Sequence, residues 1–116
     1  MEVSTGTRDR VLLVKVSGEL DMHTVAKFKD RIISKMDSNN LNDLVLNFSG
    51  VTFIDSSGLG AILGRYRSLL KKNGRIILVG LNPSVKKVFK LAGMLKIMKE
   101  CKNEDEALRE LNEGGL

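Results

Sequence analysis

FIDSSGLGAILGRY (residues 53–66) places two adjacent serines between an aspartate and two glycines, where an apolar run gives way to a helical pattern. Apolar residues after the serines recur every three or four positions, at Leu59, Ile62, Leu63 and Tyr66, and this spacing predicts one face of a helix. Asp55, Ser56 and Ser57 are therefore expected at the N-terminus of that helix. Backbone N–H groups lack partners there, and the helix dipole is positive.

Strand-like and helix-like segments alternate on both sides of this turn. Valine- and leucine-rich runs at residues 10–18, 43–50 and 75–80 predict strands, and residues 2–7 predict a partner strand with a turn at residues 8–10. Residues 96–101 are a candidate short edge strand. Helical spacing follows in segments at residues 25–36, 59–70, 83–92 and 104–111. This order predicts an α/β fold with a mixed sheet of four or five strands, surrounding helices and an antiparallel N-terminal edge hairpin.

The helix boundaries have recognisable signals. Asn73-Gly74 is expected to end the second helix, and Asn82-Pro83 to begin the third, with Asn82 as its cap. Asn103 and Glu106 have the spacing of a capping box at the start of the last helix.

Length and composition favour one compact domain, residues 1–116, with an apolar content of 42% and one proline. No run reaches the roughly 18 apolar residues that span a bilayer, and the N-terminus lacks the apolar core of a signal peptide. The single cysteine, Cys101, has no partner for an internal disulfide. These features together predict a cytoplasmic protein without a membrane partner.

The net charge of +5 is uneven, because basic residues gather between residues 61 and 102, where Glu100 is the only acidic residue. Such a belt is compatible with nucleic acid, but the aromatic residues are not interleaved with it. We expect all five aromatics (Phe28, Phe48, Phe53, Tyr66 and Phe89) in the core. The belt is then a solvated basic face, and no direct nucleic-acid partner is expected.

The serine turn allows several readings. A plain helix cap needs one side chain, whereas this turn offers Asp55, Ser56 and Ser57. A serine hydrolase would need a base, and the sole histidine, His23, is the only imidazole that could serve either serine. The turn lacks the G-x-S-x-G and P-loop patterns. No cysteine–histidine cluster suggests a metal. We expect no catalytic residue, cofactor or metal.

A further reading is that the hydroxyl is modified. A phosphoserine at a helix N-terminus is tolerated by its own fold and adds about −1.5 to −2 charges. A partner packed closely on this turn would meet that charge in a buried contact. Modification would then switch binding without unfolding the protein.

Four stretches, in this order and spacing, resemble the sporulation anti-sigma factor antagonists of the STAS domain family. They are GELD (18–21), FIDSSGLGAILGRY (53–66), NPSVKKVF (82–89) and AGM (92–94), and the likeness extends from about Val11 to Leu111. The resemblance implies a non-enzymatic protein that binds an anti-sigma factor, itself a serine kinase with bound nucleotide, and so releases a sigma factor. Phosphorylation by that kinase ends binding, and a serine phosphatase restores it.

The resemblance also assigns residues. It makes Ser56 the phosphorylation site, although the residues themselves do not separate Ser56 from Ser57. Asp55 would orient the hydroxyl or cap the helix, and Asp21 would pair with a basic partner residue or cap its own helix. Gly58 and Gly60 would allow close approach. The implied partner-binding set is Asp21, Met22, His23, Asp55, Ser56, Ser57, Gly58, Leu59 and Gly60. A regulatory domain of another stress-response or transporter system, and a small serine hydrolase, are the alternatives.

Overall fold

A computed structural model describes residues 1–113, which form one five-stranded sheet and its surrounding helices. The strands are β1 (Glu2–Arg8), β2 (Val11–Leu20), β3 (Asp43–Ile54), β4 (Ile76–Val79) and β5 (Lys99–Cys101), in the spatial order β1-β2-β3-β4-β5. The helices are α1 (Val25–Asn39), α2 (Ser56–Leu70), α3 (Pro83–Leu91) and α4 (Glu104–Glu113). β1 pairs antiparallel with β2 and the other neighbours pair parallel, so the predicted α/β fold with an antiparallel edge is confirmed.

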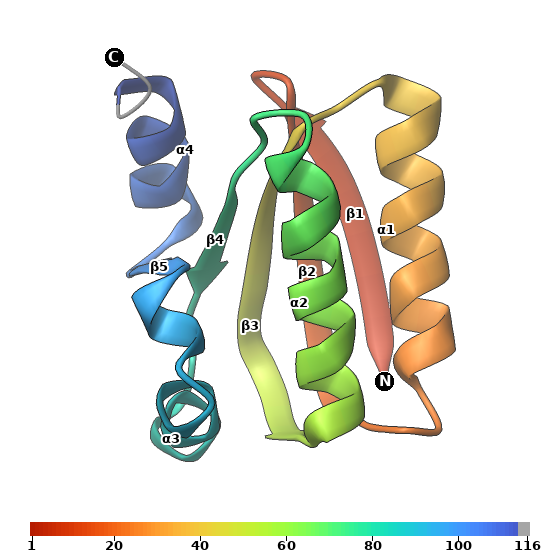
Figure 1. The fold of residues 1–116 in the computed structure, drawn as a ribbon, viewed down its shortest axis with the longest axis vertical. Helices are drawn as coiled ribbons and strands as arrows, with labels where there is room; N and C mark the ends of the chain where they lie inside the picture. The colour runs from red at the N-terminus through yellow and green to blue at the C-terminus, as the bar shows by residue number, and fades with distance from the viewer. Residues whose placement is uncertain (114–116) are drawn as a thin grey trace.

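Helices cover both faces of the sheet. Leu44 and Leu46 of β3 pack in the core beneath α1, α2 and α3, while Val45 points to a second cluster beneath α4. Figure 1 shows α2 in front of the strands, α1 on the right beside β1, and α4 on the left beyond β4. The first half of β3, residues 44–48, is buried on both faces, and apart from Asn47 it reads as an apolar run.

Three of the five aromatics form the centre of the larger core. Phe48 of β3 lies edge-on to Phe28 of α1 and to Phe89 of α3, with ring centroids 6.2 Å apart in each pair. The prediction that Phe53 joins them is wrong, because 48% of that residue is exposed. Gly18 pairs with Val51 but Glu19 pairs with Phe53, so a bulge at this point interrupts the alternation of buried and exposed residues.

Some element boundaries differ from the predicted ones. β3 continues to Ile54 instead of ending near residue 50, whereas α2 begins at Ser56, which agrees with the expected place of Asp55, Ser56 and Ser57 at the helix N-terminus. The edge strand expected at residues 96–101 is only Lys99–Cys101, because Met94–Lys96 form a short 3-10 helix. At the other boundary, β3 ends at Ile54 and α2 begins at Ser56, so Asp55 alone connects them.

The helix-end signals are largely confirmed. Asn82 Oδ1 accepts the N–H of Val85 at 2.9 Å, with Pro83 as the first residue of α3. Asn103 Oδ1 likewise accepts the N–H of Glu106 at 2.8 Å, but the Glu106 carboxylate reaches back to the N–H of Lys102 instead of Asn103. The capping box is thus only partly formed, because its second bond uses the N–H one residue before the N-cap.

The asparagine–glycine pair after α2 divides its work. Asn73, with φ of 60°, takes the left-handed conformation that was expected of a C-terminal glycine. Gly74 is needed for a different reason, since a Cβ there would collide with the backbone carbonyl of Asn42. The pair therefore ends the helix and also lets the chain pass close to the start of β3.

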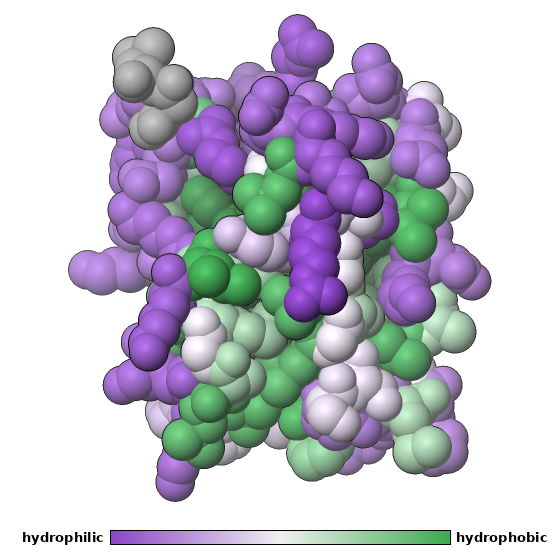
Figure 2. Space-filling view, in the orientation of Figure 1, coloured by the Kyte–Doolittle hydropathy of each residue, from purple (hydrophilic) through white to green (hydrophobic). Residues whose placement is uncertain are grey.

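Most lysines and arginines of the basic belt lie at the surface. Figure 2 shows long hydrophilic side chains over much of the face that carries α1 and α2. Two lysines of the belt are neutralised, Lys86 by Glu100 at 3.0 Å and Lys99 by Glu110 at 2.6 Å. None of the helices in residues 1–113 is both long and apolar enough to cross a membrane.

Cys101 lies at the end of β5 and is buried. Burial is the main cause that raises the pKa of its thiol above the ordinary value. The cysteine therefore behaves as a small apolar core residue rather than as a reactive thiolate.

The aromatic cluster gives a stability prediction. Phe48→Ala should lower the free energy of unfolding by about 3–5 kcal/mol, because it leaves a cavity between two edge-on rings. Phe53→Ala should cost less than about 1 kcal/mol, since half of that side chain already meets solvent. Urea unfolding followed by circular dichroism compares the two variants, and equal losses would contradict the division between core and surface.

Candidate functional site: the turn at the start of helix α2

The turn between β3 and α2 lies beside the turn between β2 and α1. Both turns follow the carboxyl ends of neighbouring parallel strands, and Figure 1 shows them together at the lower edge of the sheet. Leu20 pairs with Ile54, and the N–H of Asp55 donates to the Leu20 carbonyl at 3.3 Å. The last pairing of the two strands thus holds residues 21–23 beside residues 55–60, and we call the surface that these two turns form the rim.

Asp55 is the N-cap of α2. Its Oδ1 accepts the N–H groups of Ser57 at 2.9 Å and Gly58 at 3.1 Å, which satisfies two free donors of the first turn. Its Oδ2 accepts the N–H of Met22 at 3.3 Å from the neighbouring turn. Between the two roles left open for this side chain, the observed contacts are those of a cap, and they also join the two turns.

The two serines differ in their surroundings. Ser56 is the first residue of α2 and is exposed, and within residues 1–113 its hydroxyl has no hydrogen-bond partner. Ser57 is half-buried, and its backbone N–H is held by Asp55. A molecule that approaches the rim therefore meets the hydroxyl of Ser56 before that of Ser57.

The Asp21 turn is organised by its own side chain. Asp21 Oδ1 accepts the N–H groups of His23 at 2.9 Å and Thr24 at 3.2 Å, so Asp21 caps the turn that precedes α1 and not the helix itself, whose N-cap is Thr24. Met22 is 69% exposed, and His23 is exposed as well. The turn thus presents a flexible apolar side chain and an imidazole to solvent, next to the Ser56 turn.

The glycines of the turn have different tasks. Gly60 faces open space, so the expectation that it permits close approach of another molecule fits its position. For Gly58 that expectation is wrong, since a Cβ there would lie 2.8 Å from Ile54 Cγ1 and 2.9 Å from Leu20 Cγ. Gly58 admits the protein's own core, and Leu59 beside it packs against the same core.

Phe53 is a rim residue that the sequence reading missed. It is exposed two residues before Asp55, at the position where the bulge shifts the strand register. No signal in the sequence distinguishes it from a core aromatic, because a bulge depends on the partner strand.

The site has limited chemistry of its own. The His23 side chain, the only imidazole of the sequence, forms no hydrogen bond with either serine in the described part of the chain. Residues 1–113 contain no group of three or more His, Cys, Asp or Glu side chains that could hold a metal. The arrangement instead displays a free hydroxyl beside a carboxylate and exposed apolar groups.

Comparison with known proteins places this geometry in a family. The STAS domain matches residues 2–107, so the chain belongs to the STAS domain family. It is 39% identical over 101 residues to a protein of Paenibacillus polymyxa named anti-sigma F factor antagonist, a match that covers 87% of this chain and 86% of that protein.

Solved structures show the same architecture. The unphosphorylated form of the anti-sigma factor antagonist SpoIIAA superimposes with a TM-score of 0.84 at 31% identity, covering 99% of this chain and 98% of the other. The phosphorylated form of SpoIIAA from Bacillus gives a TM-score of 0.75 at 31% identity, covering 95% and 99%. Both forms of that protein are thus similar in fold to this chain.

The two glycines form a matched pair for mutagenesis. Gly58→Ala should destabilise the protein by about 1–3 kcal/mol, because the added methyl group overpacks the contact with Leu20 and Ile54. Gly60→Ala should leave stability unchanged or raise it by up to about 1 kcal/mol, since alanine favours the helix and meets open space. Thermal unfolding measures both, and a Gly58→Ala variant as stable as the parent would contradict the packing described.

Proposed function

We propose that the protein is an anti-sigma factor antagonist whose unphosphorylated form binds an anti-sigma factor serine kinase and so releases the sigma factor. Phosphorylation of Ser56 by that kinase ends the complex, and a serine phosphatase reverses the modification. The name of the Paenibacillus relative, anti-sigma F factor antagonist, supports this function, and the resemblance of the sequence motifs points to the sporulation system. Sigma factors act in the cytoplasm, and we place the protein there.

The observation that carries this proposal is the free Ser56 hydroxyl beside a cap that is already complete. Asp55 holds the N–H groups of Ser57 and Gly58, so neither capping nor folding requires the Ser56 side chain. The hydroxyl is exposed at the tip of the rim. An unpartnered, accessible hydroxyl on a rigid element fits the requirements of a kinase substrate.

In the transfer step, Ser56 Oγ attacks the γ-phosphorus of the nucleotide held by the kinase. The bond from that phosphorus to the β–γ bridging oxygen breaks, and the nucleoside diphosphate leaves with its magnesium ion. The serine proton passes to a base of the kinase, because Asp55 is committed to backbone N–H groups. The protein itself therefore acts as a substrate and not as an enzyme.

The capped turn also explains how the phosphate would act. A phosphate at a helix N-terminus ordinarily accepts hydrogen bonds from the free N–H groups there. Here the Asp55 carboxylate already occupies two of these donors, and its charge repels the added dianion. The phosphate is therefore turned outward, toward the surface where the kinase sits, and the complex loses affinity while the fold stays intact.

The same proposal assigns the rest of the rim to partner binding. Met22, His23 and Ser57 would contact the kinase directly, together with the exposed Gly60 and the neighbouring Leu59. Asp21 and Asp55 would act mainly by fixing the two turns, and Gly58 by allowing α2 to pack on Leu20. We add Phe53 to the contacts as an exposed aromatic anchor.

Phosphorylation gives the first test of this function. Incubation with the serine kinase of the same organism and ATP should add one phosphate, and peptide mapping should place it on Ser56. Ser56→Ala should abolish the mass increase, whereas Ser57→Ala, its matched control, should retain it. Modification that persists in Ser56→Ala would move the site, and an unmodified parent protein would refute the kinase relationship.

A negative charge at position 56 gives the second test. Ser56→Asp should fold like the parent, yet bind the kinase at least about tenfold more weakly, because a carboxylate then occupies a buried contact. Calorimetric titration measures the affinity, and far-ultraviolet circular dichroism monitors the fold. Parental affinity in Ser56→Asp, with an unchanged spectrum, would contradict a switch based on charge.

A further inference from the structure

A groove runs between α1 and α2 on the face that the two helices share. It has a volume of about 290 Å³, and its apolar floor includes Phe28 and Ile32 of α1 and Ala61 of α2. This volume is at the lower end of the range of about 300–1,000 Å³ for small-molecule pockets, and a space of this size also accommodates a few side chains of a polypeptide. Its shape therefore suggests a docking place for a polypeptide segment.

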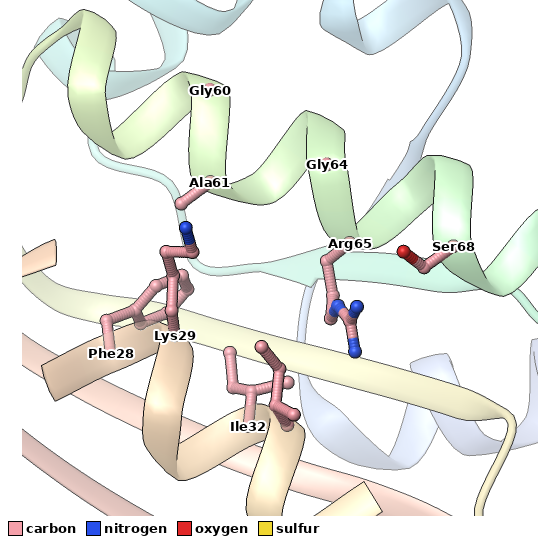
Figure 3. A pocket seen from close by; sticks show the side chains of 9 residues that line it. Phe28, Lys29, Ile32, Gly60, Ala61, Gly64, Arg65 and Ser68 are labelled. Carbon is pink, nitrogen blue, oxygen red and sulfur yellow. The ribbon is translucent and has the colours of Figure 1, made fainter. Parts of the chain in front are cut away.

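The two long edges of the groove are positively charged. Figure 3 shows Lys29 reaching from α1 toward Ala61, and Arg65 reaching from α2 toward α1. No carboxylate lines the groove, and within residues 1–113 neither cation forms an ion pair. Two uncompensated cations above an apolar floor are complementary to an apolar segment that carries carboxylates.

The groove also continues the rim around Ser56. Gly60 belongs to both, because it follows Ser56 by one helical turn and lines the groove. Gly64, one turn further, lines it too, and a Cβ at either glycine would meet open space. A partner seated on Ser56 therefore has an unobstructed path along α2 into the groove.

We propose that this groove receives an acidic, amphipathic segment of the anti-sigma factor serine kinase, with its apolar side chains on the floor and its carboxylates against Lys29 and Arg65. This inference rests on the proposed function and extends its interface along α2. It follows the mode in which an amphipathic helix lies in an apolar groove.

A second copy of the chain is a poorer occupant. In a two-fold dimer built on this face, the cations of one copy would oppose the same cations of the other. Like charges placed against each other reduce affinity. An acidic partner meets the opposite situation, since both cations then find counter-charges.

The groove would also strengthen the phosphorylation switch. A dianion on Ser56 lies one helical turn from the start of the groove, and it repels a segment that is itself acidic. The modified protein would therefore lose contacts at the tip and in the groove together.

Calorimetric titration with the purified kinase, loaded with ADP and magnesium, tests the proposal. Arg65→Glu should weaken binding by at least about tenfold and flatten its salt dependence, because an attractive charge becomes repulsive. Lys35→Glu, the same reversal at an exposed position of α1 outside the groove, should remain within about twofold of the parent. Gly64→Met should fill the groove and weaken binding with no loss of melting temperature, which a merely destabilising change could not do.

The outcomes are distinct. A parent protein that binds the kinase, with Arg65→Glu or Gly64→Met binding equally well, would overturn the groove and leave the proposed function standing. A parent protein that does not bind the kinase would overturn both. Sedimentation that shows a dimer of the parent, converted to monomer by Gly64→Met, would assign the groove to a second copy and also overturn the proposal.

Discussion

The Asp55 carboxylate is the contact on which the site depends. It accepts three backbone N–H groups, two from the first turn of α2 and one from Met22 in the neighbouring turn. Hydrogen bonds to an ionised acceptor are stronger than neutral ones, and these three fix two loops with one side chain. The rim is therefore a defined surface, although it consists of two connections between secondary-structure elements.

This use of Asp55 determines what its neighbours are free to do. Because the cap is complete, Ser56 is not needed for the helix and can be displayed to another molecule. Gly58 lets α2 pack closely on Leu20, which brings the Ser56 hydroxyl to the edge of the sheet. Gly60 has no side chain on the outer surface beside it. Asp55 and Gly58 thus stabilise the turn, whereas Ser56 and Gly60 form its exposed surface.

The pattern of helical periodicity and short apolar runs was sufficient to predict the helices and the strands from the sequence, and the alternation of these elements predicted the mixed sheet. It could not place Phe53, whose exposure results from a bulge set by pairing with β2. It also could not show how the surroundings of Ser56 and Ser57 differ, or whether the Asp55 side chain caps the helix. Their surroundings depend on hydrogen bonds to Met22 and on packing against Leu20, which are distant in the chain.

The charge of the whole molecule limits how such a switch can work. A phosphate adds about −1.5 to −2 charges, so a chain of net charge +5 remains cationic after modification. Long-range attraction to an acidic partner would then persist, and encounter rates would change little. In the proposed switch, the loss of affinity would have to arise at short range, where the dianion would be buried against the partner, and it would appear mainly as faster dissociation. A switch of this kind needs a closely fitted contact around one hydroxyl, and the capped turn with its open Gly60 provides a surface suited to that contact.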